Sequence, residues 1–238
     1  MNKQLFFLIC ILISQIAYSQ QAEKKSWQST TFKTLAVPMA MVGYGLLCES
    51  GNGYPSSYDV KNWRDKNFSS FSTKIDDATV FVPAAIVYGL DLLNVKSTND
   101  PLNQTILFAK TSFITMAIVY SLKYTTNVAR PDGSDNQSFP SAHTAMAFAY
   151  ATVLDKEFKN TWISIAGYSV ATATGAMRIL NDKHWFSDVV VGAGLGILST
   201  NLVYLTHQNK YKWDWRKNSA LFPNIGNNQY GLLWLKKF

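Results

Sequence analysis

The sequence predicts an all-α fold, a bundle of about six helices that associates with a membrane. Six apolar segments recur along the chain between polar stretches, and their lengths and Ala, Gly, Leu and Val content favour helices over strands. No internal repeat or low-complexity linker divides the chain, so its length suits one domain. The predicted helices cover about residues 35–47, 78–93, 104–122, 141–154, 161–180 and 187–206.

Residues 1–19 have the pattern of a secretory signal peptide. A basic Lys3 precedes an apolar run from Leu5 to Ile16, and the small residues Ala17 and Ser19 mark a cleavage site. We therefore expect an exported bacterial protein. The remaining chain divides into an N-terminal helix and long loop (20–75), a core (76–206) and a basic C-terminal tail (207–238).

The longest predicted loop runs from Glu49 to Asp77, after the short first helix. It is rich in Ser, Gly and Asn and carries Trp63 and Phe68. Two interpretations stay open, a lid or substrate rim and a plain surface loop. The end of the chain, Leu221 to Phe238, alternates apolar residues with Gly and Pro and predicts a short hairpin or a loop.

Lys123 and Arg130 form the first candidate cluster. They lie seven residues apart, close to two helical turns, so on a continuing helix they project from about the same face. Pro131 disfavours helix at the residue before it, which predicts a helix end near Arg130. Such a pair of cations suits a phosphate group, although interfacial cations flanking an apolar span would look the same.

The second cluster is Ser141, Ala142 and His143. Pro140 and Ser141 predict a helix start, where Ser141 caps the first turn and the free backbone amides favour an anion. Ser141 has a hydroxyl to donate to the same anion, and His143 lies within reach of it. A capping or core histidine is the alternative interpretation of His143.

Arg178, His184 and Asp188 form the third cluster. His184 and Asp188 are four residues apart and become neighbours if a helix has begun by His184. The carboxylate would then bond one ring nitrogen and fix the tautomer, which leaves the other nitrogen as a free nucleophile.

The three spacings, Lys-x6-Arg-Pro, Pro-Ser-x-His and Arg-x5-His-x3-Asp, resemble the signature of the type 2 phosphatidic acid phosphatase (PAP2) and vanadium haloperoxidase superfamily. The resemblance covers residues 76–206. It implies that His184 attacks phosphorus, that His143 protonates the leaving group and that Asp188 orients His184. The phosphate-binding residues it implies are Lys123, Arg130, Ser141, Ala142 and Arg178. Ala142 stands where the family usually has Gly, and Met177 where it commonly has Ser.

The sequence excludes several other classes of function. The net charge is +7, but no basic stripe or base-stacking motif indicates nucleic acid, and attraction to an anionic lipid surface accounts for the charge. No Cys pair, His-x-x-x-His or acidic cluster offers a metal site, and no Gly-x-x-x-x-Gly-Lys loop is present. We expect neither a metal nor another cofactor.

The charges after segment 187–206 bear on membrane topology. Lys210, Lys212, Arg216 and Lys217 are typical of a cytoplasmic flank, which turns the motif-bearing helix ends toward the periplasm. Six crossings after a cleaved signal would put this basic tail outside. Either segment 35–47 does not cross, or the bundle is a periplasmic body with buried helices.

These patterns lead to four functional hypotheses. The first is a metal-independent phosphatase that forms a phosphohistidine and hydrolyses phosphomonoesters of a lipid, such as phosphatidate, phosphatidylglycerol phosphate, undecaprenyl diphosphate or a lipid A phosphate. The second is a soluble periplasmic acid phosphatase of broad specificity. A vanadium haloperoxidase and a non-catalytic membrane protein complete the set. The sequence does not rank the substrates.

Overall fold

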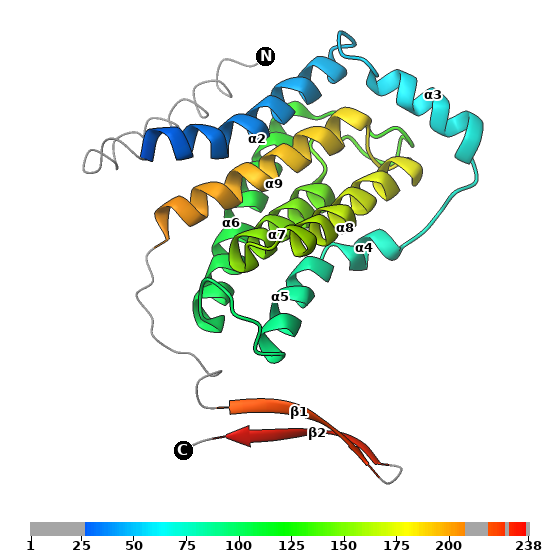
Figure 1. Cartoon of the computed structure of the whole chain (residues 1–238). Coiled ribbons are helices and arrows are strands. Elements are labelled where there is room, and N and C mark those ends of the chain that lie inside the picture. Colours follow the sequence, from blue (N-terminus) through cyan, green and yellow to red (C-terminus); the bar gives the residue numbers. More distant parts are fainter. Residues whose placement is uncertain (1–26, 208–218, 227–228, 237–238) are drawn as a thin grey trace. The chain divides into compact units, whose positions relative to one another are not determined.

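The computed structural model describes residues 27–207, 219–226 and 229–236 (Figure 1). The chain forms two compact units, residues 1–36 and 37–238, and the first is described only from Trp27. The predicted signal peptide (1–19) and the basic residues between 210 and 217 lie outside the described ranges. Apart from the first ten residues of helix α2, all features below belong to the second unit.

The described residues contain eight helices followed by two strands. Their bounds are α2 Trp27–Glu49, α3 Ser57–Phe68, α4 Ile75–Thr79, α5 Val82–Leu92, α6 Pro101–Thr126, α7 Ala142–Phe158, α8 Thr161–Leu180, α9 Phe186–Thr206, β1 Ser219–Gly226 and β2 Gln229–Lys236. The predicted all-α bundle is confirmed. Every predicted helical segment is present, and α8 has the predicted bounds.

Two details of the predicted helices are wrong. Segment 78–93 is divided between α4 and α5, with Phe81 at the N-cap of α5 and Pro83 in its first turn. Proline lacks the amide hydrogen that a continuous helix needs, but it is well suited to a helix start. Helix α6 begins earlier than predicted because the Asp100 side chain accepts hydrogen bonds from the amides of Leu102 and Asn103.

The predicted loop from Glu49 to Asp77 contains helix α3. The Ser56 and Asp59 side chains bond each other's backbone amides in a capping box. One turn later, Lys61 and Asp65 form an ion pair of 2.7 Å. Because α3 is stabilised by caps and charges rather than by an apolar stripe, hydrophobic periodicity does not reveal it.

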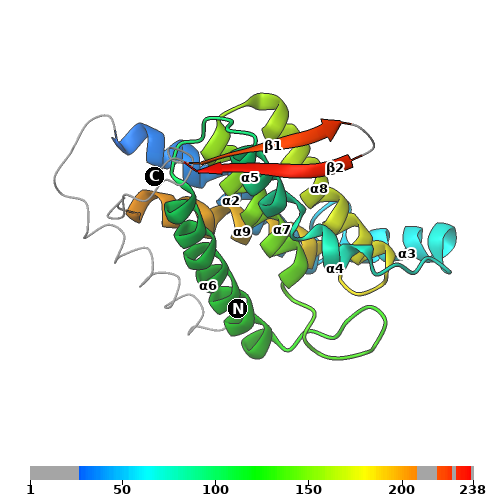
Figure 2. The same ribbon diagram turned by 90° about the horizontal axis from the view of Figure 1, so that it is seen from below.

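Helix α7 lies at the centre of the bundle and contacts α4, α5, α6, α8 and α9 (Figures 1 and 2). Four of its ten buried positions are alanines. Helix α9 approaches it at two glycines: a Cβ on Gly192 would lie 2.7 Å from the Ser141 carbonyl oxygen, and one on Gly196 would lie 2.9 Å from the Ala149 nitrogen. Small residues on both helices therefore allow the two backbones to approach closely.

Two helices, α6 and α9, are long and apolar enough to cross a membrane by length and composition. Only 33% of the apolar stretch of α6 is buried in the protein, against 56% for α9. Large aromatic side chains are exposed on the bundle, including Phe113 and Tyr124 of α6 (75% and 71%) and Trp162 of α8 (79%).

Strands β1 and β2 form an antiparallel hairpin in which Ser219 is opposite Lys236 and Gly226 is opposite Gln229. Of the two alternatives for the C-terminal segment, the structure has the hairpin.

The α7–α9 contact leads to a stability prediction. Gly196→Ala should destabilise the protein by about 1–3 kcal/mol, because its methyl group meets helix backbone that cannot move aside. The matched control is Gly43→Ala in α2, where an added Cβ has nothing within 4 Å and should stabilise the helix by roughly 0.5–1 kcal/mol. Thermal unfolding midpoints in detergent measure both. Equal midpoints for the two variants would contradict the close contact.

Candidate active site

The three predicted clusters converge at one end of the bundle, where α6 and α8 end and α7 and α9 begin. Two hydrogen bonds to backbone carbonyl groups join them. The Lys123 ammonium donates to the Ser138 carbonyl at 3.1 Å, and the Ser141 amide donates to the Asp188 carbonyl at 3.0 Å. The groups from the four helix ends also act on one another electrostatically. They thus share one polar site.

Lys123 and Arg130 do not lie on one helical face, so that prediction is wrong. Helix α6 ends at Thr126 because Asn127 adopts a left-handed conformation (φ 50°), which asparagine tolerates better than most residues. Arg130 lies in the following loop, where its Nε donates to Asp135 at 2.8 Å. Lys123 is only 4% exposed and also donates to the Gln137 carbonyl. The loop, rather than a continuing helix, brings the two cations near each other.

His184 and Asp188 form the predicted pair, with His184 Nδ1 3.3 Å from Asp188 Oδ2. The helix begins only at Phe186, however, so His184 precedes it. Asp188 sits in the first turn, and the same Oδ2 accepts the Trp185 amide at 2.9 Å. It also accepts the hydroxyl of Ser138, a residue that the sequence patterns did not single out. Asp188 is therefore held beside His184 by its bond to the Trp185 amide at the start of α9, and not because both residues lie on one helix.

Both members of this pair are buried. Burial, followed by the charges of Lys123, Arg178 and Arg130, holds the pKa of His184 well below its usual 6.5. The ring is therefore neutral at neutral pH. With Nδ1 directed to Asp188, Nε2 is the nitrogen that remains for chemistry.

Ser141 is the N-cap of α7, as predicted. Its Oγ accepts from the Thr144 amide at 3.4 Å and from the Thr144 hydroxyl at 3.0 Å, which leaves its own proton to donate. Ala142 and His143 form the first turn, whose amides point out of the helix end. His143 Nε2 lies 3.0 Å from Asp77 Oδ1 of helix α4.

Arg178, in the last turn of α8, is bound by a second carboxylate from α4. Its Nη1 donates to the buried Asp76 at 2.5 Å. The other oxygen of Asp76 accepts from Asn181 at 3.1 Å. The short helix α4 thus contributes two adjacent acids to the site, one beside Arg178 and one beside His143.

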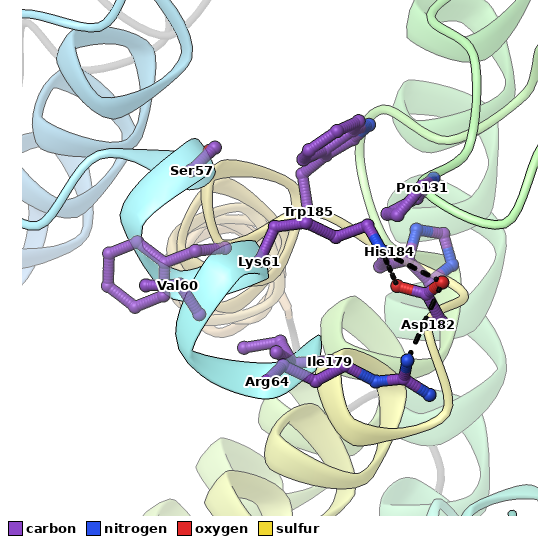
Figure 3. Close-up of a pocket in the computed structure, with 10 residues that line it drawn as sticks. Ser57, Val60, Lys61, Arg64, Pro131, Ile179, Asp182, His184 and Trp185 are labelled. Carbon is purple, nitrogen blue, oxygen red and sulfur yellow. Dashed lines mark hydrogen bonds and ion pairs between the residues drawn. The ribbon is translucent and has the colours of Figure 1, made fainter. Parts of the chain in front are cut away.

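Helix α3 borders the other side of His184 (Figure 3). A small pocket there is lined by residues that include Lys61, Arg64, Asp182, His184 and Trp185. Lys61 pairs with Asp182 at 3.1 Å, and Arg64 Nε donates to the Leu180 carbonyl at the end of α8. Of the two interpretations of segment 49–77, its contacts favour a rim of the site over a plain surface loop.

Several residues of the site escaped sequence reasoning. Asp76 lies 102 positions before Arg178 and Asp77 lies 66 positions before His143, and Ser138 precedes the second motif by two residues. The sequence shows only that two adjacent aspartates begin an apolar segment. Acids in the first turn of a helix commonly stabilise that helix through its dipole, so the pair does not by itself indicate a site. Nothing local marks their partners.

A comparison with known protein families matches most of the region from α6 to α9. Residues 105–212 match the model of the PAP2 superfamily. The PAP2 region contains all eight predicted site residues, from Lys123 to Asp188, whereas α3 and α4 precede it.

A lipid A 1-phosphatase from Porphyromonas gingivalis is 36% identical over 149 residues, which are 61% of this chain and 34% of that protein. The chain thus spans about a third of the length of this relative.

Two solved structures are similar to the chain. The PAP2-type phosphatidylglycerolphosphate phosphatase of Bacillus subtilis has a TM-score of 0.50 at 19% identity, covering 70% of this chain and 94% of that one. This likeness shows the fold. The crystal structure of Aquifex aeolicus LpxE has a TM-score of 0.46 at 23% identity, covering 60% and 93%.

The buried Asp76–Arg178 pair of the candidate site can be tested by stability. Asp76→Asn should destabilise the protein by on the order of 3 kcal/mol, because it leaves a buried guanidinium without its counter-charge. Asp77→Asn, one residue on and 62% exposed, is the matched control and should unfold like wild type. Thermal or denaturant unfolding compares the two, and a harmless Asp76→Asn would contradict the pairing.

Proposed function

We propose that the chain is a metal-independent phosphatase that hydrolyses the phosphomonoester of a membrane lipid through a phosphohistidine. The observation that carries the proposal is the buried His184–Asp188 pair at a helix end that also gathers Lys123, Arg130 and Arg178. Three fixed cations supply the charge stabilisation that a metal supplies in other phosphatases. The PAP2 match over residues 105–212 supports the same chemistry.

In the first step, His184 Nε2 forms a bond to phosphorus and the bond from phosphorus to the leaving oxygen breaks. The imidazole gains positive charge, which Asp188 stabilises at Nδ1. Ser138 and the Trp185 amide hold that carboxylate in place. Protonated His143 gives its proton to the leaving alkoxide.

In the second step, water attacks the phosphohistidine and neutral His143 takes up the proton of that water. The phosphorus–nitrogen bond breaks, so His184 returns to its neutral state and inorganic phosphate leaves. Throughout, Lys123, Arg130 and Arg178 hold the equatorial oxygens together with Ser141 and the first-turn amides at Ala142. Every proton is accounted for by His143 and water.

The surface of the bundle supports a membrane lipid as the substrate. Trp162 at the start of α8 is 79% exposed, and Tyr124 beside the active site is 71% exposed. Along α8, Trp162 and Arg178 are separated by about 24 Å, slightly less than a hydrocarbon core of about 30 Å. Exposed aromatic rings near both ends of the bundle are typical of proteins held at the two interfaces of a bilayer.

Within the lipid phosphates, we propose a lipid A type phosphate as the first substrate to test, since the P. gingivalis relative is a lipid A 1-phosphatase. We also propose that the site faces the periplasm, as the basic flank of the chain indicates. A soluble phosphatase of broad specificity is the rival. It would be extracted without detergent and would prefer small soluble esters.

Phosphate release from a panel of lipid and soluble phosphates tests the reaction. We expect activity that persists in EDTA and is inhibited by vanadate, because vanadate adopts the five-coordinate geometry of the transition state. The panel should include lipid A, phosphatidate, phosphatidylglycerol phosphate, undecaprenyl diphosphate and an aryl phosphate. Activity lost in EDTA and restored by magnesium or zinc would overturn the mechanism.

The covalent intermediate offers a separate test. His184→Ala should lose activity by orders of magnitude, since only binding and electrostatic help remain. Asp188→Asn should also lose much activity, because an amide does not stabilise the cationic ring. A brief reaction with phosphorus-labelled substrate should leave an acid-labile label on wild type and none on His184→Ala. If His184→Ala traps the same label, the nucleophile is another residue.

A further inference from the structure

His143 has a carboxylate partner of its own, supplied by helix α4. The distance from His143 Nε2 to Asp77 Oδ1 is 3.0 Å. In the described part of the chain no residue bonds the Nδ1 of His143. The arrangement mirrors that of His184, whose Nδ1 faces Asp188 and whose Nε2 is left for the substrate. Both histidines therefore use one nitrogen for a carboxylate and keep the other free.

The position of Asp77 is determined by the residue before it. Asp76 is buried, accepts from Arg178 and from Asn181, and so attaches α4 to the end of α8. Asn181 also exchanges two hydrogen bonds of 2.9 Å with the backbone of Thr73, just before α4. With α4 held at both points, Asp77 is directed at His143 even though its own side chain is 62% exposed.

We propose that Asp77 is the positioning residue of His143: it accepts the Nε2 proton, so that Nδ1 faces the leaving oxygen, and it favours the protonated ring. This inference rests on the proposed phosphatase activity. It concerns a residue outside the PAP2 match and outside every motif of the sequence. Asp77 would touch neither phosphorus nor the leaving group. Its Oδ1 also lies 3.9 Å from Arg178 Nη1, but Asp76 at 2.5 Å is the closer partner of that guanidinium, so Asp77 acts mainly through His143.

The charges around His143 show why it needs such a partner. Burial, and then the charge of Arg178, lowers the pKa of His143, while Asp77 and Asp76 raise it, and the net effect is a pKa below 6.5. The groups that face it are Arg178 of α8, both acids of α4, and His184 of the loop before α9. Without Asp77 the ring would lose its proton at a still lower pH and cease to be an acid.

The test variant is Asp77→Asn, assayed on an alkyl and an aryl phosphate across pH. A general acid is active below its pKa, so lowering that pKa moves the alkaline limb of kcat/KM to lower pH. At neutral pH we expect the alkyl phosphate to lose about 10–100-fold. Aryl leaving groups need little protonation, so the aryl phosphate should lose much less. Asp77→Glu should recover part of the loss.

Two variants serve as references for this assay. His143→Ala should show the same selective loss on alkyl phosphates, and a larger one. Asp155→Asn, twelve residues along α7 from His143, removes an acid that accepts a hydrogen bond from Ser164, and it should behave as wild type. Equal losses of Asp77→Asn on both esters, an unmoved pH limb or a gain in activity would each overturn the role of Asp77.

A readout without substrate separates this inference from the proposed function. The ring nitrogens of His143 can be titrated by NMR in nitrogen-labelled protein in detergent, with the other two histidines assigned by substitution. Asp77→Asn should lower the His143 pKa while Asp155→Asn leaves it unchanged. If wild type hydrolyses no phosphate, the proposed function fails, and the titration still decides whether Asp77 controls His143. An unchanged titration would overturn the inference by itself.

Discussion

The close contact between α7 and α9 is the constraint on which the active site depends. Gly192 lies against the carbonyl of Ser141 and Gly196 against the backbone of α7, so the two helices meet without intervening side chains. The hydrogen bond from the Ser141 amide to the Asp188 carbonyl closes the contact at the site. One helix end supplies amides for an anion and the other carries the carboxylate for His184. Since both ends are fixed to the same contact, the His184–Asp188 pair and the start of α7 keep one geometry.

Acidic and carbonyl partners explain how the protein remains folded although its site carries several positive charges. Each arginine of the site has an acid beside it, Asp135 for Arg130 and Asp76 for Arg178, while Lys123 is held by two carbonyl groups. Buried cations without such partners would cost several kcal/mol each. The partners leave part of each guanidinium for a ligand: Arg178 Nε has no partner among the residues that the structure describes. The same acids therefore stabilise the fold and position the donors.

Sequence reasoning worked where the information is local and failed where partners come from distant segments. The cap at Ser141, the α8 bounds and the His184–Asp188 pair all follow from residues within a few positions of one another. Helix α3 has no apolar periodicity that predicts it because charged pairs stabilise it, and Asn127 ends α6 before Arg130. The acids at 76 and 77 were missed because they meet their partners only in the folded chain.

Helix α4 precedes the region that matches the PAP2 model, yet its two acids contact Arg178 and His143. Its attachment needs the Asn181 side chain at the C-terminal end of α8, and Asn181 itself depends on Thr73. Arg178 is therefore bound by a helix that lies outside the sequence motif. Any change that detaches α4 would leave Arg178 without Asp76 and His143 without Asp77. Arg178 and His143 therefore both depend on one short helix, α4, that precedes the matched region of the chain.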